Sequence, residues 1–309
     1  MRILVIGQAA FGQDVFDRLR QAGEEVVAVA APAQSLSGRT DRLRAAADAA
    51  AIPAVDTSGL RDPGVQQRLR EAAPDLGVMV YVSDLIPVEV LNLPKHGTIQ
   101  YHPSLLPKHR GRSSINWAII QGDKRTGVSI FWPDAGWDTG PVLLQREVEI
   151  GPDDTTGSLY YDKLYPMGID MILESVKLVA EGKAPRAPQD ESQATYEKPA
   201  ADPLVRIDWR EPAQAVYNLI RGCDPSPGAW TRLDGNKVRI ADARLLPVDA
   251  AGPGVVASVD EDGVLIGGRG GSIMARKLAG ASGPAAPAHE FARAQGIRPG
   301  MRFLNARKD

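Results

Sequence analysis

The chain has 309 residues, 43% hydrophobic and 24% charged, proportions typical of a globular protein long enough to bury a sizeable core. Its formal net charge of −2 excludes a generally basic surface that would attract nucleic acid or an anionic membrane. A single cysteine, Cys223, excludes an internal disulfide and a cysteine-based metal site. No apolar run is long enough to span a membrane and no signal peptide is evident, so we expect a cytoplasmic protein.

The first 180 residues alternate between predicted strands and predicted helices. Apolar runs predict strands at 2–6, 25–31, 76–82, 97–101, 127–132 and 142–150, the last as an edge strand. Apolar residues at helical spacing predict helices at 13–22, 40–51, 65–73, 87–91, 113–121 and 153–179. Pro166 is expected to kink or break the last helix. This alternation predicts an α/β fold with a Rossmann-like, mostly parallel sheet and helices on both of its faces.

The composition changes after residue 180. Four prolines between 184 and 203 predict a linker. A helix is expected at 212–221, and a surface loop at 279–288. Short alternating runs with Gly and Pro turns predict a small C-terminal β-barrel, with strands at 238–240, 243–248, 254–259, 264–266 and 272–274. We therefore predict a catalytic domain at 1–183, a linker at 184–203 and a barrel-like domain at 204–309.

Two ionisable residues follow predicted strands. His102 comes directly after the strand at 97–101, and Asp138 lies in a Gly-rich turn after the strand at 127–132. Ligands of α/β proteins bind at the carboxyl ends of the strands, where both residues are expected. A histidine there can stabilise a developing oxyanion or move a proton, and an aspartate beside it can orient the imidazole and accept a proton. Taken singly, each residue is more often structural, but the pair favours an enzyme.

Several other kinds of site lack the residues that they need. Ser104 does not lie in the Gly-x-Ser-x-Gly turn of a serine nucleophile, and no cysteine is nearby. Four histidines without metal-binding spacing predict no metal site. Residues 7–12 lack the Gly-x-Gly-x-x-Gly spacing, which argues against NAD. Acid–base and electrostatic catalysis at a carbonyl, without a covalent enzyme intermediate, is the chemistry that remains.

Residues 102–107 (His-Pro-Ser-Leu-Leu-Pro), the following Arg110-Gly111 and the downstream Asp-Thr-Gly at 138–140 resemble the folate-dependent formyltransferases. That family includes methionyl-tRNA, glycinamide ribonucleotide and sugar N-formyltransferases. The resemblance is closest to the N-terminal hydrolase domain of 10-formyltetrahydrofolate dehydrogenase, on the segments 102–111, 114–117, 129–132, 181–186 and 227–230.

This resemblance implies that 10-formyltetrahydrofolate is the co-substrate. His102 would stabilise the tetrahedral oxyanion that forms when an amine or water attacks the formyl carbon, and Asp138 would hold His102 and relay the proton. The pterin is expected to lie against the backbone near two loops. The residues implied in binding it are Asp84, Leu85, Ile86, Asp134, Gly136 and Trp137.

Gln100 departs from the transferase pattern, which usually has asparagine two residues before the histidine. Glutamine keeps the amide but adds a methylene, which displaces the donor by roughly one bond length. Since a misplacement of about 1 Å can lower a rate on the order of a hundredfold, the role of Gln100 as an oxyanion donor is open. The hydrolase domain of the dehydrogenase lacks the asparagine too.

Three classes of function stay open. The first is an enzyme that transfers the formyl group of 10-formyltetrahydrofolate to an amine, to a carrier or to water. The second is methionyl-tRNA formyltransferase, but tRNA is not the expected partner. From residue 204 onward the chain has 15 Lys and Arg against 11 Asp and Glu, and 32–44 lacks a long basic insertion. The third is a non-catalytic binding or docking module. The sequence includes no carrier or aldehyde-dehydrogenase segment, so any later step is expected on another protein.

Overall fold

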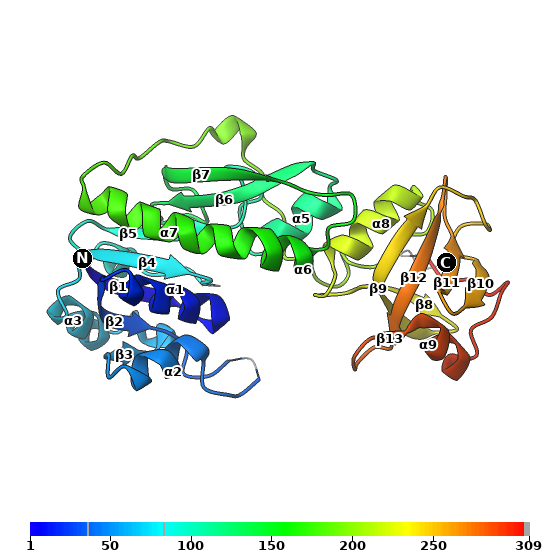
Figure 1. Cartoon of the computed structure of the whole chain (residues 1–309), viewed down its shortest axis with the longest axis horizontal. Coiled ribbons are helices and arrows are strands. Elements are labelled where there is room, and N and C mark those ends of the chain that lie inside the picture. Colours follow the sequence, from blue (N-terminus) through cyan, green and yellow to red (C-terminus); the bar gives the residue numbers. More distant parts are fainter. Residues whose placement is uncertain (36, 83, 306–309) are drawn as a thin grey trace. The chain divides into compact units, whose positions relative to one another are not determined.

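The computed structural model of the chain describes residues 1–35, 37–82 and 84–305 (Figure 1). These residues form two compact units. The first contains the described residues of 1–112, 127–148 and 162–197, and the second contains 113–126, 149–161 and 198–305. Each unit is therefore assembled from segments that are separate in the sequence. Among the described residues, no helix is both long and apolar enough to cross a membrane.

The first unit is built on a seven-stranded sheet. Its strands are β1 (Arg2–Gly7), β2 (Glu25–Ala30), β3 (Ala54–Val55), β4 (Leu76–Val80), β5 (Thr98–His102), β6 (Arg125–Phe131) and β7 (Val142–Glu149). They are arranged in the order β3-β2-β1-β4-β5-β6-β7. The pairs from β3 to β5 are parallel, and β6 runs antiparallel to β5. The predicted mostly parallel sheet, with an edge strand at β7, is confirmed.

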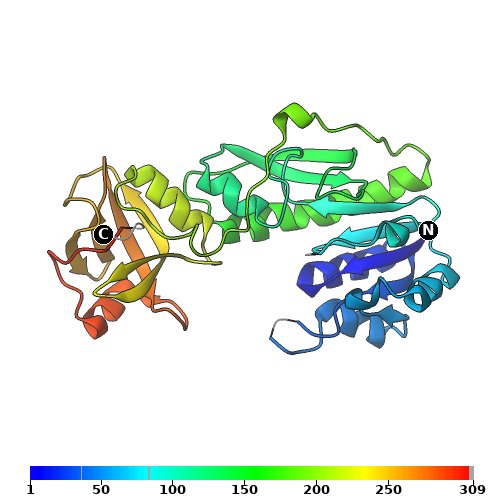
Figure 2. The ribbon, with the colours of Figure 1, turned by 180° about the vertical axis from the view of Figure 1, so that it is seen from behind.

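Helices cover both faces of this sheet. Figure 1 shows α1 (Ala9–Gln21) and α7 (Tyr165–Ala180) in front of the strands, and these two helices contact each other. On the opposite face, which Figure 2 shows from behind, apolar side chains of β1, β2 and β4 pack in one cluster with those of α3 (Pro63–Glu71) and α4 (Val88–Leu91). Helix α2 (Arg42–Ala49) packs beside α1. Because apolar side chains are buried on both sides, β1 and β4 are almost entirely apolar.

The helical stretch predicted at 153–179 is irregular just before Pro166, where a kink or break was expected. Helix α6 (Thr156–Ser158) leads into a π-helical segment, Leu159–Leu164, and α7 begins at Tyr165. Pro166 lies in the first turn of α7. Proline lacks a backbone N–H and its ring collides with a preceding turn, so it suits the start of a helix and not its interior.

The second unit contains a separate antiparallel sheet, as predicted. Its path is β10-β11-β12-β9-β8, and β13 pairs with β12. The strands are β8 (Ala229–Leu233), β9 (Asn236–Leu246), β10 (Val256–Asp260), β11 (Gly263–Gly267), β12 (Ser272–Ala279) and β13 (Ala286–Pro287). Its helices include α5 (Ser114–Ile120), α8 (Ala213–Gly222) and α9 (Ala288–Gln295). Cys223 is buried after α8, and burial raises the pKa of its thiol to about 12.

Some local predictions for the second unit were wrong. The runs at 238–240 and 243–248 belong to one strand, β9, because the chain continues through Asp242 in a left-handed conformation. Strand β8 was not predicted. The end of the loop expected at 279–288 pairs with β12 as β13, and α9 follows it. Pro287 before α9 and the left-handed Gly296 after it were the available signals for this helix.

The pleat of β5 sends Tyr101 to the side of the sheet covered by α1 and α7. Its ring lies 4.5 Å from the ring of Phe11, centroid to centroid, and a methyl group on Gly168 would overlap it. We therefore predict that Gly168→Ala destabilises the protein. Overpacking costs about 1–3 kcal/mol, which exceeds the gain of roughly 0.5–1 kcal/mol from replacing a helical glycine.

Chemical denaturation measures this difference, with Gly59→Ala as the control. A methyl group on Gly59 would meet no atom closer than 3.5 Å. An unfolding free energy for Gly168→Ala equal to or above that of the parent would contradict the packing described here.

Candidate active site

His102 is the last residue of β5, and its side chain is buried. Side chains alternate along a strand, so His102 and Gln100 share the face of the sheet opposite to Tyr101. In the sheet, Gln100 lies opposite Phe131 and His102 lies opposite Ser129, both in β6. Gln100 is half-buried. Two of the predicted catalytic residues are therefore neighbours on one face.

Neighbouring strands hold the turn that follows His102. The Ser129 hydroxyl donates to the carbonyl of Ser104 at 2.7 Å and accepts from the N–H of Leu106 at 3.1 Å. The Gln145 amide of β7 donates to the Leu106 carbonyl at 3.0 Å and to the Ser129 hydroxyl at 2.9 Å. The Ser104 hydroxyl donates to the Lys108 carbonyl at 2.6 Å and so stabilises the turn itself.

Asp138 lies beside His102, although 36 residues separate them in the sequence. Its Oδ2 is 3.5 Å from Nδ1 of His102, and both side chains are 6% exposed. The same oxygen accepts a hydrogen bond from the N–H of Gly111 at 2.7 Å. Asp138 has a φ of 56°, a left-handed conformation that is uncommon for a residue with a side chain. The predicted histidine–aspartate pair is thus assembled in a protected environment.

The other ring nitrogen of His102 has a defined partner. Nε2 lies 2.8 Å from the carbonyl oxygen of His109. A carbonyl can only accept a hydrogen bond, so this geometry places a proton on Nε2 of His102. The ring therefore presents an N–H donor on one side and faces the carboxylate on the other. Such an arrangement can donate to a developing oxyanion and exchange a proton through Asp138.

The loop that carries Asp138 is held in shape by its own polar groups. The Asp134 carboxylate accepts hydrogen bonds from the N–H of Gly136 and the hydroxyl of Thr139. A side chain on Gly136 would overlap Thr139, and one on Gly140 would overlap the Trp132 carbonyl. Both positions therefore need glycine, because neighbouring atoms lie too close for a side chain. The Asp134 carboxylate stabilises the loop to which it belongs.

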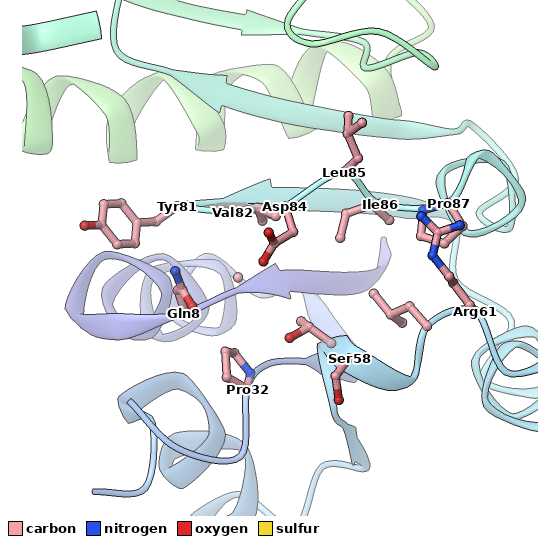
Figure 3. A pocket seen from close by; sticks show the side chains of 13 residues that line it. Gln8, Pro32, Ser58, Arg61, Tyr81, Val82, Asp84, Leu85, Ile86 and Pro87 are labelled. Carbon is pink, nitrogen blue, oxygen red and sulfur yellow. The ribbon is translucent and has the colours of Figure 1, made fainter. Parts of the chain in front are cut away.

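The described part of the first unit contains a pocket of about 380 Å³ at the carboxyl ends of β1 and β4 (Figure 3). The order of the strands reverses at β1, and such points are where ligands bind in open α/β sheets. Gln8 and Asp84 point into the pocket from two different loops (Figure 3). The described residues that line it are Gly7, Gln8, Pro32, Thr57, Ser58, Leu60, Arg61, Tyr81, Val82, Asp84, Leu85, Ile86 and Pro87.

Three of the residues expected to bind the co-substrate, Asp84, Leu85 and Ile86, line this pocket, while Asp134, Gly136 and Trp137 lie on the loop beside Asp138. Arg112, which we had not predicted, contacts both groups. Its Nη2 lies 3.1 Å from Oδ1 of Asp84, and its guanidinium carbon lies 5.5 Å from the centre of the Trp137 ring.

The amino end of α1 is occupied by a carboxylate of the chain itself. Asp41 is buried, and its Oδ2 accepts a hydrogen bond from the N–H of Ala9 at 2.8 Å. Its Oδ1 accepts from the N–H of Leu43 at 2.9 Å and caps α2. In dinucleotide-binding folds this helix end binds the cofactor phosphate. Among the described residues, no group of three or more His, Cys, Asp or Glu is arranged to hold a metal ion.

A segment that we call the strap, residues 187–197, runs back along the first unit beside β7 (Figures 1 and 2), with Ala187 paired to Val142. It lies within the region for which we predicted a linker. The Arg110 side chain is 1% exposed and donates two hydrogen bonds to the side-chain oxygen Oε1 of Gln189 and two to the Glu191 carboxylate. Hydrogen bonding between Arg110 and Glu191 raises the pKa of Arg110 and lowers that of Glu191.

The end of the strap contacts the loop that follows His102 and the loop that carries Asp138. The Thr195 hydroxyl accepts from the N–H of His109 at 2.8 Å, and the Tyr196 hydroxyl donates to the Trp137 carbonyl at 2.6 Å. The His109 ring lies 3.3 Å from the Glu197 carboxylate. The strap residues Gln189, Glu191, Thr195, Tyr196 and Glu197 were not predicted to belong to the site, and the only signal for any of them in the sequence was Arg110, the partner of Gln189 and Glu191, within a motif.

Two family matches cover most of the chain. Residues 1–172 match the family described as formyl transferase, and 204–296 match the one described as formyl transferase, C-terminal domain. The chain is 40% identical over 308 residues to the cytosolic 10-formyltetrahydrofolate dehydrogenase of Mus musculus, covering 94% of this chain and 34% of that protein. It spans only about a third of the length of the dehydrogenases that it matches.

Two further similarities extend along nearly the whole chain. It is 35% identical over 312 residues to the methionyl-tRNA formyltransferase of Geobacter sulfurreducens, covering 99% of this chain and 98% of that protein. Its structure is similar to that of HypX from Aquifex aeolicus in complex with tetrahydrofolic acid, with a TM-score of 0.70 and 21% identity. This match covers 96% of the present chain and 47% of HypX. At that identity it shows the fold.

The hydrogen bond to the His109 carbonyl predicts the protonation of His102. In ¹⁵N-labelled protein, two-bond nitrogen–proton spectra at neutral pH should show a proton on Nε2 of His102, because a deprotonated Nε2 would face an oxygen lone pair. The variant His102→Gln identifies the signals of this ring among those of the four histidines. A spectrum with the proton on Nδ1 alone would contradict the geometry.

Proposed function

Because this chain belongs to the formyl transferase family, we propose that it removes the formyl group of 10-formyltetrahydrofolate by direct attack of an amine or of water on the formyl carbon. The family matches confirm the family that the motifs predicted. Members of this family are enzymes. The observation that carries the proposal is the buried His102–Asp138 pair at the end of β5.

The proposed reaction follows from the donors and acceptors of this pair. Attack at the formyl carbon forms a tetrahedral oxyanion, which requires a hydrogen-bond donor. The N–H of His102 Nε2 supplies it when the formyl oxygen replaces the His109 carbonyl. The proton of the attacking amine or water passes to Asp138, which the Gly111 N–H holds in place. The bond to N10 of the folate then breaks, and N10 receives a proton through the same pair. The products are tetrahydrofolate and either a formamide or formate.

We place the pterin against the loop of Asp84, Leu85 and Ile86 and against the loop of residues 134–138. The support is the pocket that the first loop lines and the contact of Arg112 with both loops. A cavity of about 380 Å³ lies in the range typical of small-molecule sites. The apolar Leu85 and Ile86 are suited to a ring, and backbone groups are suited to its polar edge.

The acceptor separates the candidate functions. The motifs around His102 resemble the hydrolase domain of 10-formyltetrahydrofolate dehydrogenase more closely than the transferases, and Gln100 stands in place of asparagine. Both features favour transfer to water or to a small amine. A second candidate, methionyl-tRNA formyltransferase, is supported by the Geobacter relative, which is matched over 98% of its length. Product analysis after incubation with 10-formyltetrahydrofolate alone, with amines and with charged initiator tRNA distinguishes formate from each formylated product.

We predict that His102→Ala and Asp138→Asn each reduce formyl removal by more than about tenfold while folate affinity stays close to that of the parent. Both groups act on the transition state, so their loss lowers the rate more than the binding. Tetrahydrofolate formation at saturating co-substrate measures the rate, and equilibrium binding of a folate measures the affinity.

Matched controls are His96→Ala and Asp48→Asn, which change exposed residues away from the pair. Turnover above about a tenth of the parent rate in either site variant would refute the assignment of catalysis to this pair. Catalysis would then belong elsewhere, or the protein would be a binding module.

We also predict that Gln100→Leu lowers turnover by less than about tenfold, or roughly 1.4 kcal/mol. The reason is that the His102 donor suffices if the site works as a hydrolase. Loss of a true oxyanion donor instead costs roughly 2.7–4 kcal/mol, so a decrease of a hundredfold or more would show that Gln100 is one. In Gln100→Asn, increased transfer to an amine would show that this position selects the acceptor.

A further inference from the structure

We propose that Gln189 is a positioning residue that fixes the catalytic Asp138 through its backbone. This inference rests on the role proposed for Asp138. The Gln189 amide nitrogen donates hydrogen bonds to the carbonyls of Asp138 at 2.8 Å and of Gly140 at 2.6 Å. One side chain therefore holds both ends of the three-residue turn that presents the carboxylate to His102.

The backbone of Asp138 needs such support. Its φ of 56° is a left-handed conformation, which is uncommon for a residue with a β-carbon. Conformations of this kind persist when the surrounding structure enforces them. The Gly111 N–H holds the carboxylate, and Gln189 holds the carbonyl of the same residue. Asp138 is thus fixed at both its side chain and its main chain.

The orientation of the Gln189 amide is set by Arg110. A guanidinium can only donate, and its Nε and Nη2 lie 3.2 and 2.8 Å from the Gln189 oxygen. The amide nitrogen must therefore face the two backbone carbonyls. Only a side chain of this length that carries both an acceptor and a donor can bond to Arg110 and to the two backbone carbonyls. Glutamate would keep the Arg110 contacts but would present an oxygen to two carbonyl oxygens.

This chain of contacts joins the two catalytic loops. Arg110 precedes Gly111, whose N–H contacts the Asp138 carboxylate, and Arg110 also holds Gln189. The loop after His102 therefore reaches Asp138 by two routes, one direct and one through the strap. Loss of the Gln189 donor removes the second route and leaves the left-handed turn without its backbone partner.

Gln189→Glu in the full-length protein tests this role. We expect turnover to fall on the order of a hundredfold, as for a displacement of about 1 Å at a reacting group, with folate affinity changed by less than about twofold. In an Asp138→Asn background the same substitution should have no further effect on turnover, because Gln189 acts through Asp138. A purely structural role would lower both backgrounds equally. Gln193→Glu, an exposed change in the same strap, is the matched control.

A second measurement does not depend on activity. Amide hydrogen exchange of the peptide covering 134–140 should accelerate in Gln189→Glu and also in the uncharged Gln189→Met, but not in Gln193→Glu. Unchanged exchange there, or a turnover loss below about tenfold in an active parent, would overturn the proposal. If the parent protein does not act on 10-formyltetrahydrofolate, the proposed function fails, while the exchange result still decides whether Gln189 holds the loop.

Discussion

The buried guanidinium of Arg110 and the Gln189 amide connect segments that lie 79 residues apart, and the geometry of the candidate site depends on this contact. A buried guanidinium without partners costs several kcal/mol, so its four hydrogen bonds to Gln189 and Glu191 strongly favour one arrangement of the strap. The Gln189 amide in turn donates hydrogen bonds to two backbone carbonyls of the turn that carries Asp138.

The sheet supplies the other half of the site. His102 can face Asp138 because β5 ends at this residue and its pleat turns Tyr101 to the opposite, apolar face. Ser129 of β6, the strand next to β5, and Gln145 of β7 hold the turn that follows His102 by hydrogen bonds. The histidine is therefore held by a rigid element, and the aspartate by a loop that the strap braces. A histidine on a strand and an aspartate on a braced loop are suited to a site in which protons would move between groups held in place.

Close packing and polar satisfaction also limit what the site can accept. The Asp41 carboxylate occupies the end of α1 where a phosphate would otherwise bind, so a ligand in the nearby pocket would meet side chains and loop backbone instead of this helix end. Arg112 links the pocket loop to the Asp138 loop. A ligand that contacts both loops would therefore extend toward His102. This position would suit the proposed co-substrate, whose reactive carbon lies apart from its ring.

Local pattern was enough to predict six of the seven strands of the first unit, all except the two-residue β3, and the irregular helix around Pro166, because these depend on periodicity and on the chemistry of proline. It also placed His102 and Asp138 after neighbouring strands, where the structure brings them together. The same information could not identify Gln189, since a polar residue in a Pro-rich stretch has the composition of a linker. Its role arises only when the chain returns to Arg110 and two backbone carbonyls. Likewise, Arg61 and Thr57 join Asp84 in one pocket only through the order of the strands. The sequence by itself thus determined most elements of the first unit and the chemical pair, whereas tertiary structure decided which distant donors satisfy the buried polar groups that hold that pair in place.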